Sequence, residues 1–163
     1  MFDCGAGNAD EEKVLSLYIS VFGKNPQRIL DIGSGPGFFL KFFKDKEWDV
    51  VGIEPSKSAA VFSRGLGLKI IQDSIYKINS NDLGLFDLVH SNQVFEHLIA
   101  PDKALEVIHE ILNPNGLLFL SVANDYNPIQ KIAHEKLNLP DWWFIPPEHI
   151  NYFRIPCLCV WRL

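Results

Sequence analysis

The chain has 163 residues, 47% of them hydrophobic, and a formal net charge of -5 at pH 7. This length and apolar content predict a single globular domain that spans residues 1–163. The 20 acidic and 15 basic side chains include no basic block that would neutralise a run of phosphates, so we expect no nucleic-acid partner.

Three further features of the sequence bear on cellular location, membrane association and the use of the cysteines. Residues 1–13 are polar and acidic and lack the apolar core of a secretory signal. No stretch approaches the roughly 18 uninterrupted apolar residues of a membrane span. Cys4, Cys157 and Cys159 are odd in number and have no nearby partners that would complete a metal site. We therefore expect a cytoplasmic protein with no membrane partner, no disulfide framework and no bound metal.

The predicted elements alternate between helices and strands along the chain. Apolar periodicity and caps predict, in order, a helix over 10–22, a strand over 28–32, a helix over 38–46, a strand over 49–53, a helix over 56–66, strands over 68–72 and 86–90, a helix over 101–112, a strand over 117–122 and a helix over 127–138. Strands that alternate with helices favour a parallel sheet covered on both faces. The sequence therefore predicts an α/β fold, a Rossmann-like sandwich of three layers with a mainly parallel sheet.

A glycine-rich turn joins the first predicted strand to the helix that follows. Gly33, Gly35 and Gly37 allow a ligand to approach the backbone, and the N-terminus of the next helix presents unpaired N–H groups. Glu54 ends the second strand, where an acid can accept hydrogen bonds from both hydroxyls of a ribose. Phe38 stands where the G-x-G-x-x-G pattern of dinucleotide-binding proteins has its third glycine. The turn therefore predicts a nucleoside-containing ligand other than a nicotinamide or flavin dinucleotide.

The glycine turn and the strand before it resemble motif I of the class I S-adenosylmethionine (SAM) dependent methyltransferases. The matching residues are Ile-Leu-Asp-Ile-Gly-Ser-Gly-Pro-Gly at 29–37. The resemblance implies that SAM is the cofactor, that Asp31 lies near its amino group and that Glu54 holds its ribose. It also implies that the cofactor passes along the turn residues Gly33, Ser34, Gly35 and Gly37. An interpretation of Asp31 as a local cap stays open.

A second segment, Ile-Gln-Asp-Ser at 71–74, is similar to the same family after its third strand. An acid at this place in the family binds the adenine amino group, which implies Asp73 and the adjacent Ser74 as cofactor ligands. Asp73 as an ordinary loop residue or helix cap is the alternative.

A third segment, residues 86–98, is similar to the fourth-strand region of small-molecule methyltransferases, including the ubiquinone-biosynthesis O-methyltransferases. The similarity implies that Ser91, Asn92 and Gln93 lie beside the cofactor at the carboxyl end of the strand. Asn92 and Gln93 as loop residues that face water are the alternative.

The Pro-Glu-His-Ile-Asn-Tyr-Phe stretch at 147–153 resembles one that follows the fifth strand in some members of this family. His149 is the candidate catalytic base for a hydroxyl acceptor, because a neutral imidazole titrates near the working pH. A packed structural histidine is the alternative, and Trp142, Trp143 and Tyr152 are candidates to line an acceptor pocket. The resemblance implies methyl transfer to a small-molecule acceptor, with oxygen as the expected atom. A SAM-binding module or inactive remnant without turnover is the competing hypothesis.

The end of the chain departs from this family. Members normally continue after the fifth strand with a helix and an antiparallel pair of strands, and residues 157–163 are too short for both strands. We therefore expect the sheet to lack the usual last two strands and the domain to be incomplete at its C-terminus. The strand over 117–122 would then be an exposed edge, open to self-association with another chain.

Overall fold

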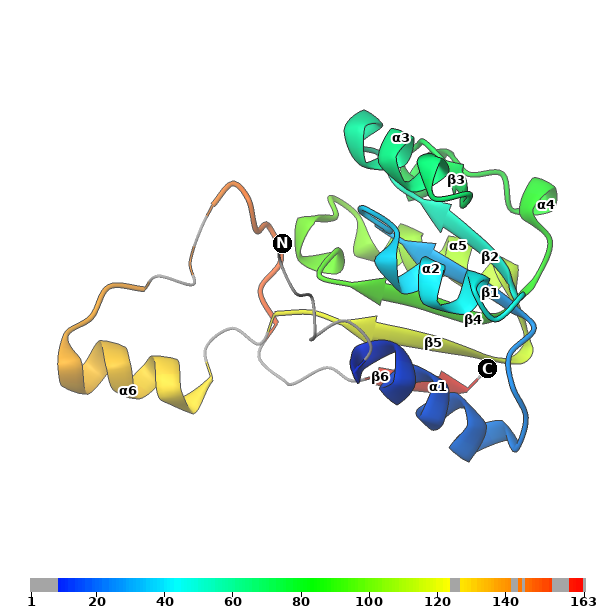
Figure 1. The fold of residues 1–163 in the computed structure, drawn as a ribbon. Coiled ribbons are helices and arrows are strands. Elements are labelled where there is room, and N and C mark those ends of the chain that lie inside the picture. Colours follow the sequence, from blue (N-terminus) through cyan, green and yellow to red (C-terminus); the bar gives the residue numbers. More distant parts are fainter. Residues whose placement is uncertain (1–8, 124–126, 142–143, 145, 154–158, 163) are drawn as a thin grey trace, which may run out of the picture.

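Figure 1 shows the computed structural model, which describes residues 9–123, 127–141, 144, 146–153 and 159–162. A six-stranded sheet forms its centre, with the strands in the order β3-β2-β1-β4-β5-β6. The strands are β1 (Arg28–Ile32), β2 (Asp49–Ile53), β3 (Lys69–Ile71), β4 (Phe86–Asn92), β5 (Leu112–Ser121) and β6 (Cys159–Arg162). The first five strands run parallel to their neighbours, whereas β6 runs antiparallel to β5.

Helices cover both faces of this sheet. The α-helices are α1 (Ala9–Phe22), α2 (Phe38–Lys44), α3 (Lys57–Gly65), α4 (Ser80–Leu83), α5 (Pro101–Ile111) and α6 (Pro128–Leu137), and the 3-10 helices are η1 (Ile75–Lys77) and η2 (Phe95–His97). Side chains of α1, α2 and α3 pack in one hydrophobic core, and those of α4 and α5 pack in another. α6 extends away from the sheet in Figure 1. Of the helices in the described part of the chain, none combines the length and the apolar character that a membrane span needs.

Side-chain alternation along the central strand divides the core into these two parts. In β1, Leu30 packs in the same cluster as Ile108 of α5, whereas Ile29 packs in the cluster of Leu40 of α2. Successive side chains of a strand point to opposite faces, and apolar runs are typical of parallel strands buried on both sides. Burial of each such side chain contributes about 1.5–3 kcal/mol. Both helix layers therefore fix the positions of the strand ends, where the candidate site lies.

The predicted three-layer α/β fold with a mainly parallel sheet is confirmed. β1 and β2 have the predicted bounds, and the helices that follow them begin within a residue of their predicted starts. β5 begins earlier than predicted, at Leu112, directly after α5. α4, η1, η2 and β6 were not predicted, because each has only three or four residues, too few to show a period in the sequence.

The expectation that β5 is an exposed edge is wrong. Leu117–Leu120 of β5 pair in antiparallel register with Cys159–Arg162, so β6 covers this edge. The backbone groups of β5 that another chain would need for pairing are therefore hydrogen-bonded within this chain, and the predicted route to self-association loses its basis.

Candidate functional site

A pocket of about 340 Å³ lies at the carboxyl ends of β1 and β2. Its polar lining residues are Glu54, Ser74, Gln93 and His97. Its apolar lining residues include Ile32, Ile53, Ile75, Val94 and Leu98, and Gly33 and Pro55 complete the wall. The pocket therefore lies beside the central strand, at the end of the sheet where open α/β folds bind their ligands.

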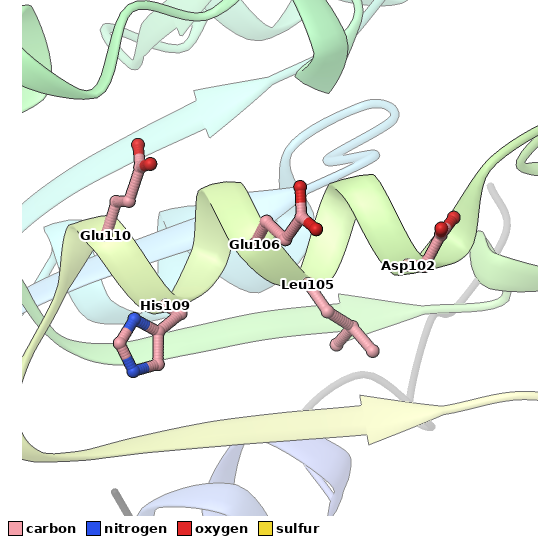
Figure 2. A pocket seen from close by; sticks show the side chains of 5 residues that line it. All are labelled: Asp102, Leu105, Glu106, His109 and Glu110. Carbon is pink, nitrogen blue, oxygen red and sulfur yellow. The ribbon is translucent and has the colours of Figure 1, made fainter.

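A second pocket, on the outer surface of α5, has a larger volume of about 460 Å³. Figure 2 shows that a single helix supplies all of its lining residues, which are Asp102, Leu105, Glu106, His109 and Glu110. Three carboxylates on one exposed helix face are typical of a solvated surface. We therefore regard the smaller pocket at the strand ends as the candidate site.

The Glu54 carboxylate is held in a fixed orientation at the edge of this pocket. Its Oε2 accepts a hydrogen bond from the Gly35 N–H at 2.7 Å, and its Oε1 accepts one from the Ser56 N–H at 2.7 Å. The Ser63 hydroxyl in turn lies 2.8 Å from the Gly35 carbonyl oxygen, to which it donates. Each carboxylate oxygen can accept more than one hydrogen bond, so both oxygens keep capacity for a ligand.

Two glycines of the turn are required by its geometry. Gly33 has φ 71° and Gly37 has φ 79°, a region that side chains with a Cβ rarely adopt. A Cβ on Gly33 would clash with Val94 Cγ2, and one on Gly37 would lie 2.5 Å from Leu68 Cδ1. The turn can therefore pack against the strand ends only because these positions lack a side chain.

The side chain of Asp31, the predicted partner of an amino group, is buried and does not line the pocket. Its Oδ1 is 2.7 Å from Nδ1 of His90 on the neighbouring strand, and the two side chains are 5% and 7% exposed. The His90 ring stacks on Phe39 of α2, with 3.7 Å between ring centroids. This geometry gives Asp31 a structural partner, and its contact with a ligand stays a prediction.

Asp73 and Ser74 occupy different surroundings after β3. Ser74 lines the pocket and is the N-cap residue of η1. Asp73 Oδ1 accepts a hydrogen bond from the Ser74 N–H at 2.8 Å and lies 3.4 Å from Nζ of Lys77. The Asp73 side chain is half-exposed, so it has capacity for a ligand, and its present contacts are those of an ordinary turn residue.

The three residues predicted as cofactor ligands at the end of β4 have different surroundings in the structure. Gln93 lines the pocket with φ 55°, and its N–H donates to the Ser121 carbonyl oxygen at 2.9 Å. Asn92 is exposed at the end of the strand. Ser91 is fully buried, and its hydroxyl has no hydrogen-bond partner among the described residues.

His149 lies next to η2 rather than in the pocket wall. Its ring centroid is 4.9 Å from that of His97, which does line the pocket. His97 Nδ1 is 2.6 Å from the Glu148 carbonyl oxygen, and because a carbonyl only accepts, this nitrogen carries a hydrogen. Glu96, His97 and His149 offer ligand atoms within 4.8 Å of one another, an arrangement that could hold a metal ion and that the sequence analysis did not anticipate.

Several lining residues escaped the sequence analysis. Val94, His97 and Leu98 belong to the segment whose family resemblance was noted, yet only the residues before them were selected as ligands. The Phe-Glu-His element at 95–97 was the available signal for His97. Of the suggested acceptor-pocket residues, Trp142 and Trp143 lie outside the described residues. Tyr152 does not line the pocket, and its ring centroid is 6.3 Å from that of His149.

Comparison with known families and sequences gives a consistent result. A family model described as "Methyltransferase domain" matches residues 9–161. The C-methyltransferase NovU of Streptomyces niveus is 25% identical over 162 residues, covering 96% of this chain and 37% of that protein. A ubiquinone biosynthesis O-methyltransferase of Pectobacterium carotovorum is 26% identical over 110 residues, covering 64% of this chain and 45% of that protein. The chain thus spans less than half the length of these curated relatives.

Solved structures share the fold. The plantazolicin methyltransferase BpumL, solved in complex with SAH, has a TM-score of 0.66 and 24% identity, covering 78% of this chain and 49% of that one. CalS10, an amino pentose methyltransferase from Micromonospora echinaspora solved with bound SAM, has a TM-score of 0.64 and 19% identity, covering 72% of this chain and 51% of that one.

Proposed function

Because the chain belongs to the methyltransferase domain family, we propose that it binds SAM in the pocket at the ends of β1 and β2 and transfers a methyl group to a small-molecule acceptor. The main support for this proposal is the geometry of Glu54, which lines the pocket and whose two carboxylate oxygens are oriented by backbone N–H groups. A carboxylate held in this way can accept hydrogen bonds from the two hydroxyls of a ribose without reorganising. The residues present therefore fit a nucleoside cofactor.

The rest of the pocket supports the same cofactor. Ile53, Ile75 and Leu98 supply apolar surface for a planar base, and Asp73 with Ser74 supplies polar groups at the end of β3. For the amino-acid part of SAM we propose the turn residues Gly33, Ser34, Gly35 and Gly37, together with Asp31 as partner of the ammonium group. We also propose that Ser91, Asn92 and Gln93, at the end of β4, lie beside the cofactor.

SAM, when bound, supplies an electrophilic methyl group whose sulfonium carrier leaves as a neutral thioether. The chain has to exclude water, align the acceptor and, for a hydroxyl acceptor, remove a proton. We propose His149 for that proton, because it lies beside the pocket-lining His97 and its Nδ1 is buried without a hydrogen-bond partner among the described residues. Oxygen is the acceptor atom that the sequence analysis favours, while the relatives include a C-methyltransferase and an amino pentose methyltransferase.

A SAM-binding module without turnover is the second candidate. The observation that favours it is that His149 does not line the pocket, so no described basic group other than His97 borders the bound cofactor. This candidate predicts cofactor binding without methyl transfer to any acceptor.

Calorimetric titration with S-adenosylhomocysteine (SAH) tests the proposed cofactor site. We expect saturable binding by the wild type and at least about tenfold weaker binding by Glu54→Gln, because a hydrogen bond to a charged group contributes about 1.5–3 kcal/mol. Glu110→Gln, a change of the same charge on the exposed face of α5, should bind like the wild type. If the folded wild type does not bind SAH, or binds NADH more tightly than SAH, the proposal is wrong.

A further inference from the structure

Residues 148–153, which we call the strap, lie against η2 and the residue that follows it. Four hydrogen bonds come from two strap residues. The N–H groups of Ile150 and Asn151 both donate to the Glu96 carbonyl oxygen, at 2.9 and 3.1 Å, and the Asn151 side-chain amide donates to the carbonyl oxygens of Phe95 at 3.0 Å and Leu98 at 2.6 Å. A fifth bond, from His97 to the strap carbonyl of Glu148, adds to them.

Asn151 is suited to this position by the chemistry of its side chain. The Phe95 carbonyl oxygen also accepts a hydrogen bond from the Leu98 N–H at 3.3 Å. A carbonyl oxygen has two lone pairs, so the carbonyls of Phe95 and Leu98 can each take the further bond that the two N–H donors of a primary amide offer. Asp has nearly the same shape but no donor when ionised, and it would bring a negative charge to two carbonyl oxygens. The side-chain amide of Asn151 therefore attaches the strap to η2 in a way that Asp cannot replace.

The Glu96 carboxylate is buried beside this attachment. Glu96 is 0% exposed, and neither of its carboxylate oxygens has a hydrogen-bond partner in the described part of the chain. Its carboxylate lies within 4.8 Å of ligand nitrogens of His97 and of the strap residue His149. Taking a carboxylate out of water without pairing it is unfavourable. Because His149 of the strap lies this close to the Glu96 carboxylate, we expect that removing the strap from η2 would expose this carboxylate to water.

We propose that Asn151 is a positioning residue, which holds the strap on η2 and thereby holds His149 beside the cofactor pocket, and that the unpaired Glu96 keeps this attachment weak enough to open for the acceptor. The inference rests on the proposed function, because it gives the strap the role of carrying the base. η2 and the residue after it link the strap to the pocket, since His97 and Leu98 contact the strap and also line the pocket.

Hydrogen exchange of the backbone amides of Ile150 and Asn151, followed by NMR on the ligand-free chain, tests the attachment directly. Asn151→Asp should speed exchange at the Ile150 amide by at least about tenfold, and Glu96→Gln should slow exchange at both amides, because it replaces the buried, unpaired carboxyl group with a neutral amide. Asn81→Asp makes the same substitution at an exposed residue of α4 and should leave both amides unchanged.

Two results would overturn the proposal. Unchanged exchange at Ile150 in Asn151→Asp would show that the side-chain amide does not hold the strap. Faster exchange in Glu96→Gln would show that the carboxylate stabilises the strap instead of opposing it. If Asn151→Asp does not fold, the Glu96→Gln result still decides the role of Glu96, and exchange in Asn151→Ala decides that of Asn151.

A positioning role makes a further demand on the same variant. In Asn151→Asp the NMR signals of the His149 ring should shift, while the affinity for SAH stays within about threefold of the wild type. If Asn151→Asp loses SAH affinity as well as the attachment of the strap, the site is generally damaged and a positioning role is contradicted. Because exchange is measured without ligand, its outcome is separate from that of the SAH titration that tests the proposed function.

Discussion

Gly33 has a left-handed backbone conformation and lies in close contact with Val94 of the pocket wall. We predict that Gly33→Ala lowers the free energy of unfolding by about 1–3 kcal/mol through strain and overpacking, and that it weakens SAH binding. Urea unfolding and calorimetry measure the two effects. Gly65→Ala is the matched control, because a Cβ there meets nothing within 4 Å, and we expect it to be neutral or to stabilise by up to about 1 kcal/mol.

Tyr18 of α1 titrates at a higher pH than a free tyrosine. Burial and, secondly, the negative charge of Asp87 raise the pKa of Tyr18 above its usual value of 10.0. The neutral phenol is therefore favoured by folding, so its contribution to stability is present below about pH 10 and is lost as the pH rises through the elevated pKa. We predict that the free energy of unfolding falls less steeply above about pH 10 in Tyr18→Phe than in the wild type. Urea unfolding in a pH series measures this, and parallel profiles would contradict it.

At the scale of elements, the Asp31–His90 pair connects the two central strands. We predict that His90→Phe, which keeps an aromatic ring between Phe39 and Phe119, lowers the free energy of unfolding by about 3 kcal/mol, because it leaves the buried Asp31 carboxylate unpaired. Urea unfolding measures the change. The double variant Asp31→Leu with His90→Phe should recover most of the loss, and an equally unstable double variant would assign the loss to the ring instead.

The long elements of this chain could be predicted from sequence, and the contacts between them could not. β1 and β2 are apolar runs bounded by turn residues, and the glycine turn has a recognisable spacing, so both the sheet centre and the pocket region followed from residues 28–54. The His90 partner of Asp31 lies 59 residues away in the chain, and sequence periodicity carries no information about such a pair. The strap on η2 escaped prediction for the same reason.

At the scale of the whole molecule, β6 decides whether β5 is an edge strand of the sheet. Deleting residues 159–163 would leave Leu117–Leu120 of β5 without antiparallel partners. We predict that the shortened chain associates with itself in a concentration-dependent way, because an unpaired apolar strand is a template for another chain. Sedimentation velocity over a range of concentrations measures this, and a shortened chain that stays monomeric would show that β5 is protected by other means.

The strand order also bears on how the protein is made. β1 is among the first strands to leave the ribosome, yet one of its two neighbours is β4, whose residues Leu88–Ser91 follow about 60 positions later. Until β4 has been synthesised, one edge of β1 and the apolar surface that β4 will cover stay open, and closing such a long loop is entropically costly. Synthesis that pauses between residues 72 and 86 would therefore prolong the state in which β1 lacks its β4 neighbour and can pair with another chain.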